Sequence, residues 1–224
     1  MKKYLFIRLT LLILLLTLST NTNAYALELD YGLSYNNLVY YQYQAEKLND
    51  DYFMREDLNE GLGLYAELKY PLNNFTLGAG IDKINADWTG RNEYVNDRYR
   101  DFEYAVRIVG PYLKVAYNLS SNFKINTNLA YYDYQESFQA EYSWQEEDLD
   151  VSLKNARGLG VLLGGEYHHQ ITNLLYLSNS FNFRYIALNI IENYDWYREE
   201  MKEVDNEQLI VRGLSLKLGI NYRF

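Results

Sequence analysis

This chain of 224 residues has no cysteine and two histidines, which leaves few side chains for nucleophilic, acid–base or metal chemistry. The lack of cysteine excludes a thiolate zinc site, an iron–sulfur cluster and a cysteine nucleophile. The two histidines, His168 and His169, are adjacent, and we expect them in a short solvated turn. Ser178 and Ser180 then have no nearby histidine to activate them. The sequence therefore predicts no enzyme, no cofactor and no metal site.

Other patterns that suggest chemistry have simpler explanations. Carboxylate pairs such as Glu146 and Glu147 lie in charged stretches, which are usually hydrated surface. The closely spaced glycines match no phosphate-binding G-x-G-x-x-G motif, and we expect most of them to leave room for inward side chains such as Tyr65 and Tyr176. A net charge of −9 argues against nucleic-acid binding, which needs a basic face.

Charged residues also recur at alternate positions, opposite apolar ones. In a β-strand these two sets point to opposite faces of the sheet. Acids and bases are nearly balanced in the charged set, so they could pair inside a closed sheet. We predict an ion-pair network in a barrel lumen, formed by Glu67, Lys69, Asp82, Lys114, Glu166, Arg184 and Lys217.

Apolar residues with a period of two predict eight strands. The clearest alternation ends the chain, from Leu214 to Phe224. Gly110 and Pro111 separate an even apolar phase from an odd one, which predicts a β-bulge at residues 110–112. The other seven apolar segments are 27–35, 62–70, 75–81, 113–119, 123–131, 159–167 and 175–185.

Short and long connections alternate between these segments. The short ones are 71–74, 120–122 and 168–173, whereas 46–60, 86–101, 136–154 and 190–207 are long. This order predicts an up-and-down barrel with both termini on the side of the short turns. The long segments together carry 23 acids and 8 bases, so we expect acidic outer loops.

The N-terminus predicts export. Lys2 and Lys3 precede an apolar run at 9–18, and a small-x-small pattern follows at 24–26. The run is shorter than the roughly 20 residues of a spanning helix. We expect a signal peptide at 1–26 and a mature domain at 27–224.

Together these features resemble the small bacterial outer-membrane β-barrels, the OmpA/OmpX-like group in the broad sense. The resemblance implies an all-β fold: an eight-stranded antiparallel up-and-down transmembrane β-barrel in the bacterial outer membrane, with both termini periplasmic. It also implies a C-terminal signal read by the barrel-insertion machinery, formed by Leu216, Leu218, Ile220, Tyr222 and Phe224.

A soluble lipocalin-type barrel is the competing fold, because alternation alone does not say which face is inside. Aromatic residues at both ends of the strands favour the membrane barrel over the soluble one, because aromatic girdles lie at the two membrane–water interfaces. The expected girdles are Tyr70, Phe75, Phe123, Tyr167, Tyr222 and Phe224 near the short turns, and Tyr131, Tyr185 and Trp88 near the long loops.

We expect a structural or surface-interaction protein with a polar, plugged lumen. A narrow OmpW-like channel for small or apolar solutes is the first alternative, because inward glycines could widen the lumen. An outer-leaflet lipid-modifying enzyme is the second. The expected partners are outer-membrane lipid, the insertion machinery, and divalent cations or a basic partner at the acidic loops.

Overall fold

The computed structural model describes residues 27–44, 59–93, 99–142, 149–195, 200–203 and 207–224. The predicted signal peptide at 1–26 lies outside these residues. The described residues form nine strands and include no helix long and apolar enough to span a membrane. The strands are β1 (Glu28–Gln44), β2 (Asn59–Leu72), β3 (Phe75–Glu93), β4 (Tyr99–Asn118), β5 (Phe123–Tyr142), β6 (Leu149–Gln170), β7 (Leu175–Asp195), β8 (Glu200–Glu203) and β9 (Glu207–Arg223).

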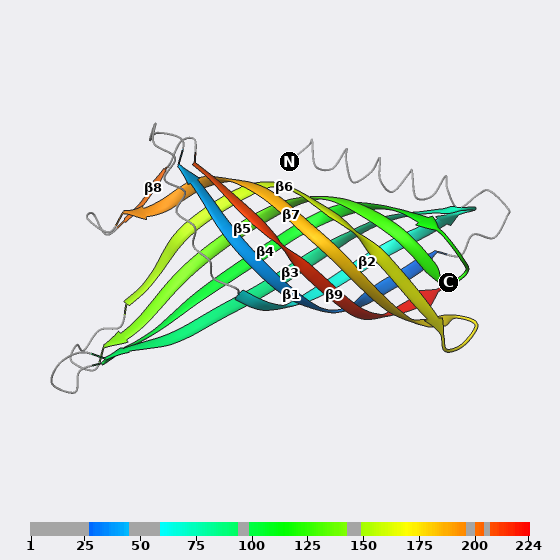
Figure 1. Cartoon of the computed structure of the whole chain (residues 1–224), viewed down its shortest axis with the longest axis horizontal. Helices are drawn as coiled ribbons and strands as arrows, with labels where there is room; N and C mark the ends of the chain where they lie inside the picture. Colours follow the sequence, from blue (N-terminus) through cyan, green and yellow to red (C-terminus); the bar gives the residue numbers. More distant parts are fainter. Residues whose placement is uncertain (1–26, 45–58, 94–98, 143–148, 196–199, 204–206) are drawn as a thin grey trace, which may run out of the picture.

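Eight of these strands close into a ring, which Figure 1 shows as a barrel of tilted strands. Each strand from β1 to β7 is antiparallel to the next, and β9 pairs with both β7 and β1. The short β8 pairs only with the end of β7. A tight turn joins β2 to β3, where Asn73 adopts a left-handed backbone conformation with a φ of 48°. The predicted eight-stranded antiparallel up-and-down fold is confirmed.

The pairing register fixes the tilt of the strands. The paired residues can be followed from Leu33 on β1 through each strand of the ring in turn. The path returns to β1 at Tyr43, so the register is staggered by ten residues around the barrel. Such a stagger makes strands in an eight-stranded barrel tilt by about 35–45°. Glu28 pairs with Arg223, so the two ends of the barrel domain lie together at the end with the short turns.

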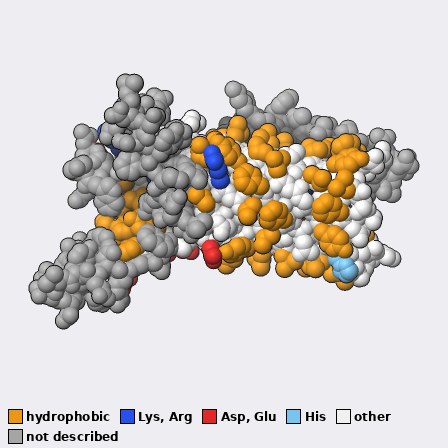
Figure 2. All heavy atoms as spheres, in the orientation of Figure 1, with side chains coloured by type: hydrophobic (Ala, Val, Ile, Leu, Met, Phe, Trp, Pro, Cys, Tyr) orange, Lys and Arg blue, Asp and Glu red, His pale blue; other side chains and the backbone are white. Residues whose placement is uncertain are grey.

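The barrel is apolar outside and charged inside. Leu62, Leu113 and Leu159 are more than half exposed on the outer wall, whereas Asp82 and Arg184 are fully buried in the interior. Figure 2 shows apolar side chains spread over the barrel between its two ends. A lipocalin has the opposite arrangement, so the soluble barrel is excluded, and lipid is the solvent that suits this outer wall.

The predicted bulge at residues 110–112 is wrong. The β3–β4 ladder passes through this segment without a shift, and the β4–β5 register is the same on either side of it. The even apolar residues before Gly110, such as Val106 and Ile108, point inward because they belong to an apolar layer of the lumen. The register shifts lie elsewhere, next to Ser137 and next to Asn155.

Three of the predicted long loops are wrong over much of their length. Strands continue through residues 86–93, 99–101, 136–142, 149–154, 190–195 and 200–203. In these segments the alternation persists on the inward face, where Phe138, Ala140 and Leu153 form an apolar cluster. The rest of these three loops, and the fourth loop up to residue 58, lie outside the described residues.

The aromatic residues expected near the short turns lie mostly on the outer wall. Phe75, Phe123, Tyr167 and Tyr222 are exposed there, and Tyr70 is half-buried. Phe224 is also exposed, as are Tyr131 and Tyr185 toward the far end. The side chain of Trp88 is outside the described part of the chain.

Candidate functional site

The seven residues of the predicted lumen network all point into the barrel. None is more than 7% exposed. The period of two places each of them on the inner face of its strand. They come from six strands: Glu67 and Lys69 from β2, Asp82 from β3, Lys114 from β4, Glu166 from β6, Arg184 from β7 and Lys217 from β9.

Two lysines join three carboxylates near the short-turn end. The Lys69 ammonium donates to Asp30 Oδ2 at 2.6 Å and also to Glu166. Lys114 donates to Glu166 as well, and its Nζ lies 3.0 Å from Glu67 Oε1. Because these groups are desolvated, removal of one partner leaves an uncompensated buried charge.

A second cluster surrounds Asp82, further from the short turns. Arg184 Nη2 donates to Asp82 Oδ2 at 2.6 Å, and the Tyr132 hydroxyl donates to the same oxygen at 3.4 Å. Lys217 Nζ lies 3.9 Å from the other carboxylate oxygen. The predicted seven residues therefore form two ionic clusters.

Two tyrosines that the sequence analysis did not assign to the network connect these clusters. The Tyr112 hydroxyl donates to Glu67 Oε2 at 2.8 Å. The Lys217 ammonium lies 5.2 Å from the ring centre of Tyr112 and 4.8 Å from that of Tyr65, within cation–π range. The linked clusters cross the middle of the lumen, and a hollow of about 540 Å³ lined by Glu28, Lys124 and Arg223, among others, lies at the short-turn end.

His168 belongs to this interior, so the prediction of a solvated turn is wrong for it. β6 continues to Gln170, and His168 is 1% exposed with its Nε2 at 2.5 Å from Glu166 Oε1. It also pairs in register with Ser178, contrary to the expectation that this serine has no histidine nearby. Ser178 Oγ donates to Asp30 at 2.8 Å, whereas His168 is bonded to Glu166. The serine and the histidine therefore contact different carboxylates.

Asp30, Glu166 and His168 have the side-chain types of a metal site. Ligand atoms of the three lie within 4.8 Å of one another. The Lys69 ammonium contacts both carboxylates, however, and so supplies a positive charge at the place where a metal ion would bind. The donor set therefore fits an internal ion pair, and a metal ion would have to displace Lys69.

An apolar layer lies above the charges, so the prediction of a polar lumen holds only in part. Beyond this layer the lumen is charged again, where Lys154 Nζ lies 3.5 Å from Oε2 of the buried Glu136. Along β3 the inward series passes from Asp82 to Ile84, and along β7 it passes from Arg184 to Ile186. These residues belong to one buried apolar layer above the charges. Its fully or almost fully buried members include Leu38, Ile84, Ile108, Ile186, Leu188 and Val211.

Inward glycines make room for tyrosine side chains. The expectation is confirmed for Tyr65, whose hydroxyl lies where a Cβ at Gly219 would be, and the same holds for Tyr112 and Tyr132. A Cβ at Gly160 would lie 2.6 Å from the Tyr132 ring, and Gly110 also faces that ring. A Cβ at Gly80 would lie 2.7 Å from Tyr112. The space that these glycines leave is therefore filled by protein.

A small cavity lies among the charged groups. Its volume is about 10 Å³, and its lining includes Asp30, Tyr65, Glu166 and Lys217. This space holds about one water molecule. It offers no room for a larger solute.

The residues of the predicted C-terminal signal lie on the outer face of β9 and at its end. Leu216, Leu218 and Phe224 are more than half exposed, and Ile220 and Tyr222 are exposed to a smaller extent. The Phe224 amide donates to the Leu27 carbonyl at 2.9 Å, which ties the last residue to the first described one.

A closed ring of eight tilted strands, apolar outside and ionic within, is a small transmembrane β-barrel of the kind found in bacterial outer membranes. No protein-family model and no curated protein sequence matches the chain. Solved structures similar to it include Neisserial surface protein A, with 14% identity, a TM-score of 0.46, and 88% of this chain and 97% of that chain covered.

Two other similar structures are outer-membrane proteins. OprG from Pseudomonas aeruginosa is 12% identical, with a TM-score of 0.40 and coverage of 90% of this chain and 96% of that one. AlkL, solved in lipid bilayers, is 10% identical, with a TM-score of 0.45 and coverage of 90% and 91%.

Proposed function

We propose that this protein is a closed outer-membrane barrel with a structural or surface-interaction role and no enzymatic activity. Both termini face the periplasm, and the outer hairpins present acidic tips to the exterior, where divalent cations or a basic partner bind. The C-terminal residues from Leu216 to Phe224 act as the signal for the insertion machinery.

The layered interior carries this proposal. Ions entering from the short-turn end meet paired charges, and beyond them a buried apolar layer that contains Ile84, Ile108 and Ile186. An ion in such a layer would lose its hydration without gaining a partner. The two layers therefore close the lumen to current.

The narrow-channel alternative has less support. Its argument was the space left by inward glycines, and Tyr112 and Tyr132 occupy that space. The enzymatic alternative needs a histidine that substrate can reach near the outer rim. His168 is buried and bonded to Glu166, and the exposed His169 lies at the opposite end, beside a short turn.

Planar-bilayer recording of the refolded barrel tests the closed lumen. We expect no stable conductance steps, whereas a general porin under the same conditions gives them because its lumen is water-filled. Steady steps of uniform size from the refolded barrel would refute the proposal.

A further inference from the structure

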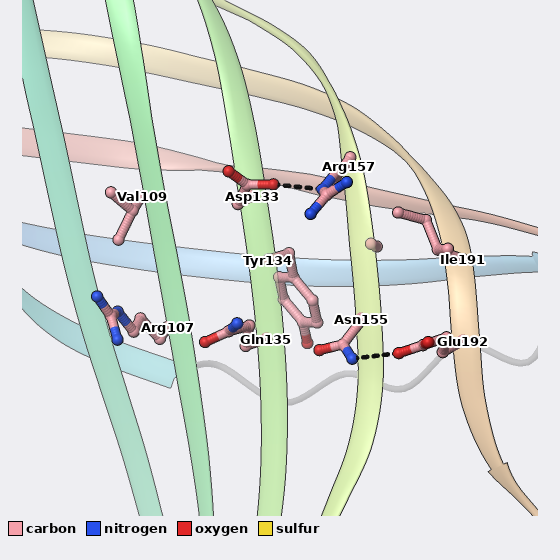
Figure 3. Close-up of a pocket in the computed structure, with 10 residues that line it drawn as sticks. Arg107, Val109, Asp133, Tyr134, Gln135, Asn155, Arg157, Ile191 and Glu192 are labelled. Atoms are coloured by element: carbon pink, nitrogen blue, oxygen red, sulfur yellow. Dashed lines mark hydrogen bonds and ion pairs between the residues drawn. The ribbon is translucent and has the colours of Figure 1, made fainter. Parts of the chain in front are cut away.

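A hollow of about 450 Å³ lies on the outer wall of the barrel, across β4 to β7 (Figure 3). The β6–β7 register shifts next to Asn155, so Ile191 is an extra residue in β7. Such bulges bend a sheet locally. The hollow is lined by Arg107, Val109, Asp133, Gln135, Asn155, Arg157, Ile191 and Glu192, among others.

The hollow begins where the apolar outer wall ends. On β5 the exposed apolar series reaches Tyr131, and the next outward residue is Asp133. On β6 the corresponding step is from Leu159 to Arg157. Since the apolar band matches the hydrocarbon core, the hollow lies at the level of lipid headgroups, in the leaflet away from the short turns.

The hollow is lined by two arginines and two carboxylates, and Arg107 on β4 is separated by two strands from Glu192 on β7. Arg157 Nε donates to Asp133 Oδ1 at 2.6 Å, and Asn155 Nδ2 donates to Glu192 Oε2 at 2.6 Å. Figure 3 shows both contacts, with Arg107 on the neighbouring strand beyond Gln135. Arg107 is exposed and has no hydrogen bond or ion pair with any residue that the structure describes.

We propose that this hollow binds the phosphate-bearing headgroup of an outer-leaflet lipid. Arg107 contacts the phosphate, because a guanidinium presents paired donors that match its oxygens. The acyl chains lie along the exposed Leu113, Leu129 and Leu159 below. The inference rests on the proposed membrane location. It assigns the expected contact with outer-membrane lipid to one particular site.

Lipid A titration followed by native mass spectrometry tests the site, with the wild-type barrel compared with Arg107→Gln. Loss of a charged hydrogen bond should weaken lipid A binding about tenfold. Arg212→Gln is the matched control: Arg212 is an exposed cation directly beyond Leu214 on β9, stacked over Tyr185 outside the hollow. The lipid A affinity of Arg212→Gln should stay within about twofold of the wild-type affinity.

Equal binding by wild type and Arg107→Gln would overturn the site, as would equal weakening by Arg212→Gln, which would indicate general attraction only. Heat-modifiable gel migration shows whether each variant is folded. Because Arg107 lies outside the lumen, the two proposals fail separately. Conductance by the wild type would refute the closed lumen even if lipid A binding depended on Arg107.

Discussion

Two ion pairs of equal length lie in opposite surroundings. The Lys69–Asp30 pair is buried and the Arg157–Asp133 pair is more than half exposed, and both have a nitrogen–oxygen distance of 2.6 Å. Lys69→Met should lower the free energy of unfolding by about 3–5 kcal/mol, because it leaves the buried Asp30 carboxylate without its ion-pair partner. Arg157→Gln should lower it by at most about 1 kcal/mol. Urea unfolding in detergent, followed by intrinsic fluorescence, measures both changes.

A second substitution separates charge from packing. Asp30→Asn added to Lys69→Met removes the carboxylate that lost its ion-pair partner, so it should recover part of the lost stability. Equal losses for Lys69→Met and Arg157→Gln, or no recovery in the double variant, would contradict the account of the ionic clusters.

At the scale of residues, alternation was enough to place the seven charged side chains inside. It also contained the signal for His168, which is two positions after Glu166 on the same inward series. The sequence predicted a turn there because Tyr167 is the last residue of the outward apolar series. Tyr112 and Tyr132 were missed because an aromatic residue suits either face of a membrane strand.

The strands could be predicted from the sequence over the segments whose outward residues are apolar. Their continuations beyond the apolar wall were harder to predict. Past Tyr131 the outer face of β5 turns polar, and the alternation passes to inward residues such as Phe138. A search for apolar outer faces therefore ends the strands too early. The register shifts next to Ser137 and Asn155 depend on the partner strand, which one segment alone does not reveal.

The last strand gives a prediction at the scale of elements. Phe224→Ala should reduce the fraction of heat-modifiable, folded barrel in cells several-fold, since it removes the terminal aromatic of the proposed insertion signal. Phe75→Ala removes an equally lipid-facing ring beside a short turn and should change this fraction little. Pulse-labelling followed by unheated gel electrophoresis measures it, and equal defects in the two variants would argue against a signal.

The whole molecule combines three layers of different polarity. Its outer wall suits hydrocarbon, the inner half of its lumen is ionic, and the next layer of the lumen is apolar. Length, turn order and alternation predicted the closed ring. The separation of the lumen into an ionic and an apolar layer was not predictable from single strands. It becomes visible only when the inward residues of all strands are compared at the same distance along the barrel axis.

The central claim is that lipid touches the apolar side chains while the alternate residues are enclosed. Three consecutive residues of β6 test it: Val161 and Leu163 are 39% and 55% exposed, and Leu162 between them is 1% exposed. The chain has no native cysteine, so Val161→Cys, Leu162→Cys and Leu163→Cys can each be treated with a bilayer-confined maleimide in vesicles. We predict labelling at 161 and 163 and none at 162. Labelling at 162 with protection of its neighbours would contradict the account.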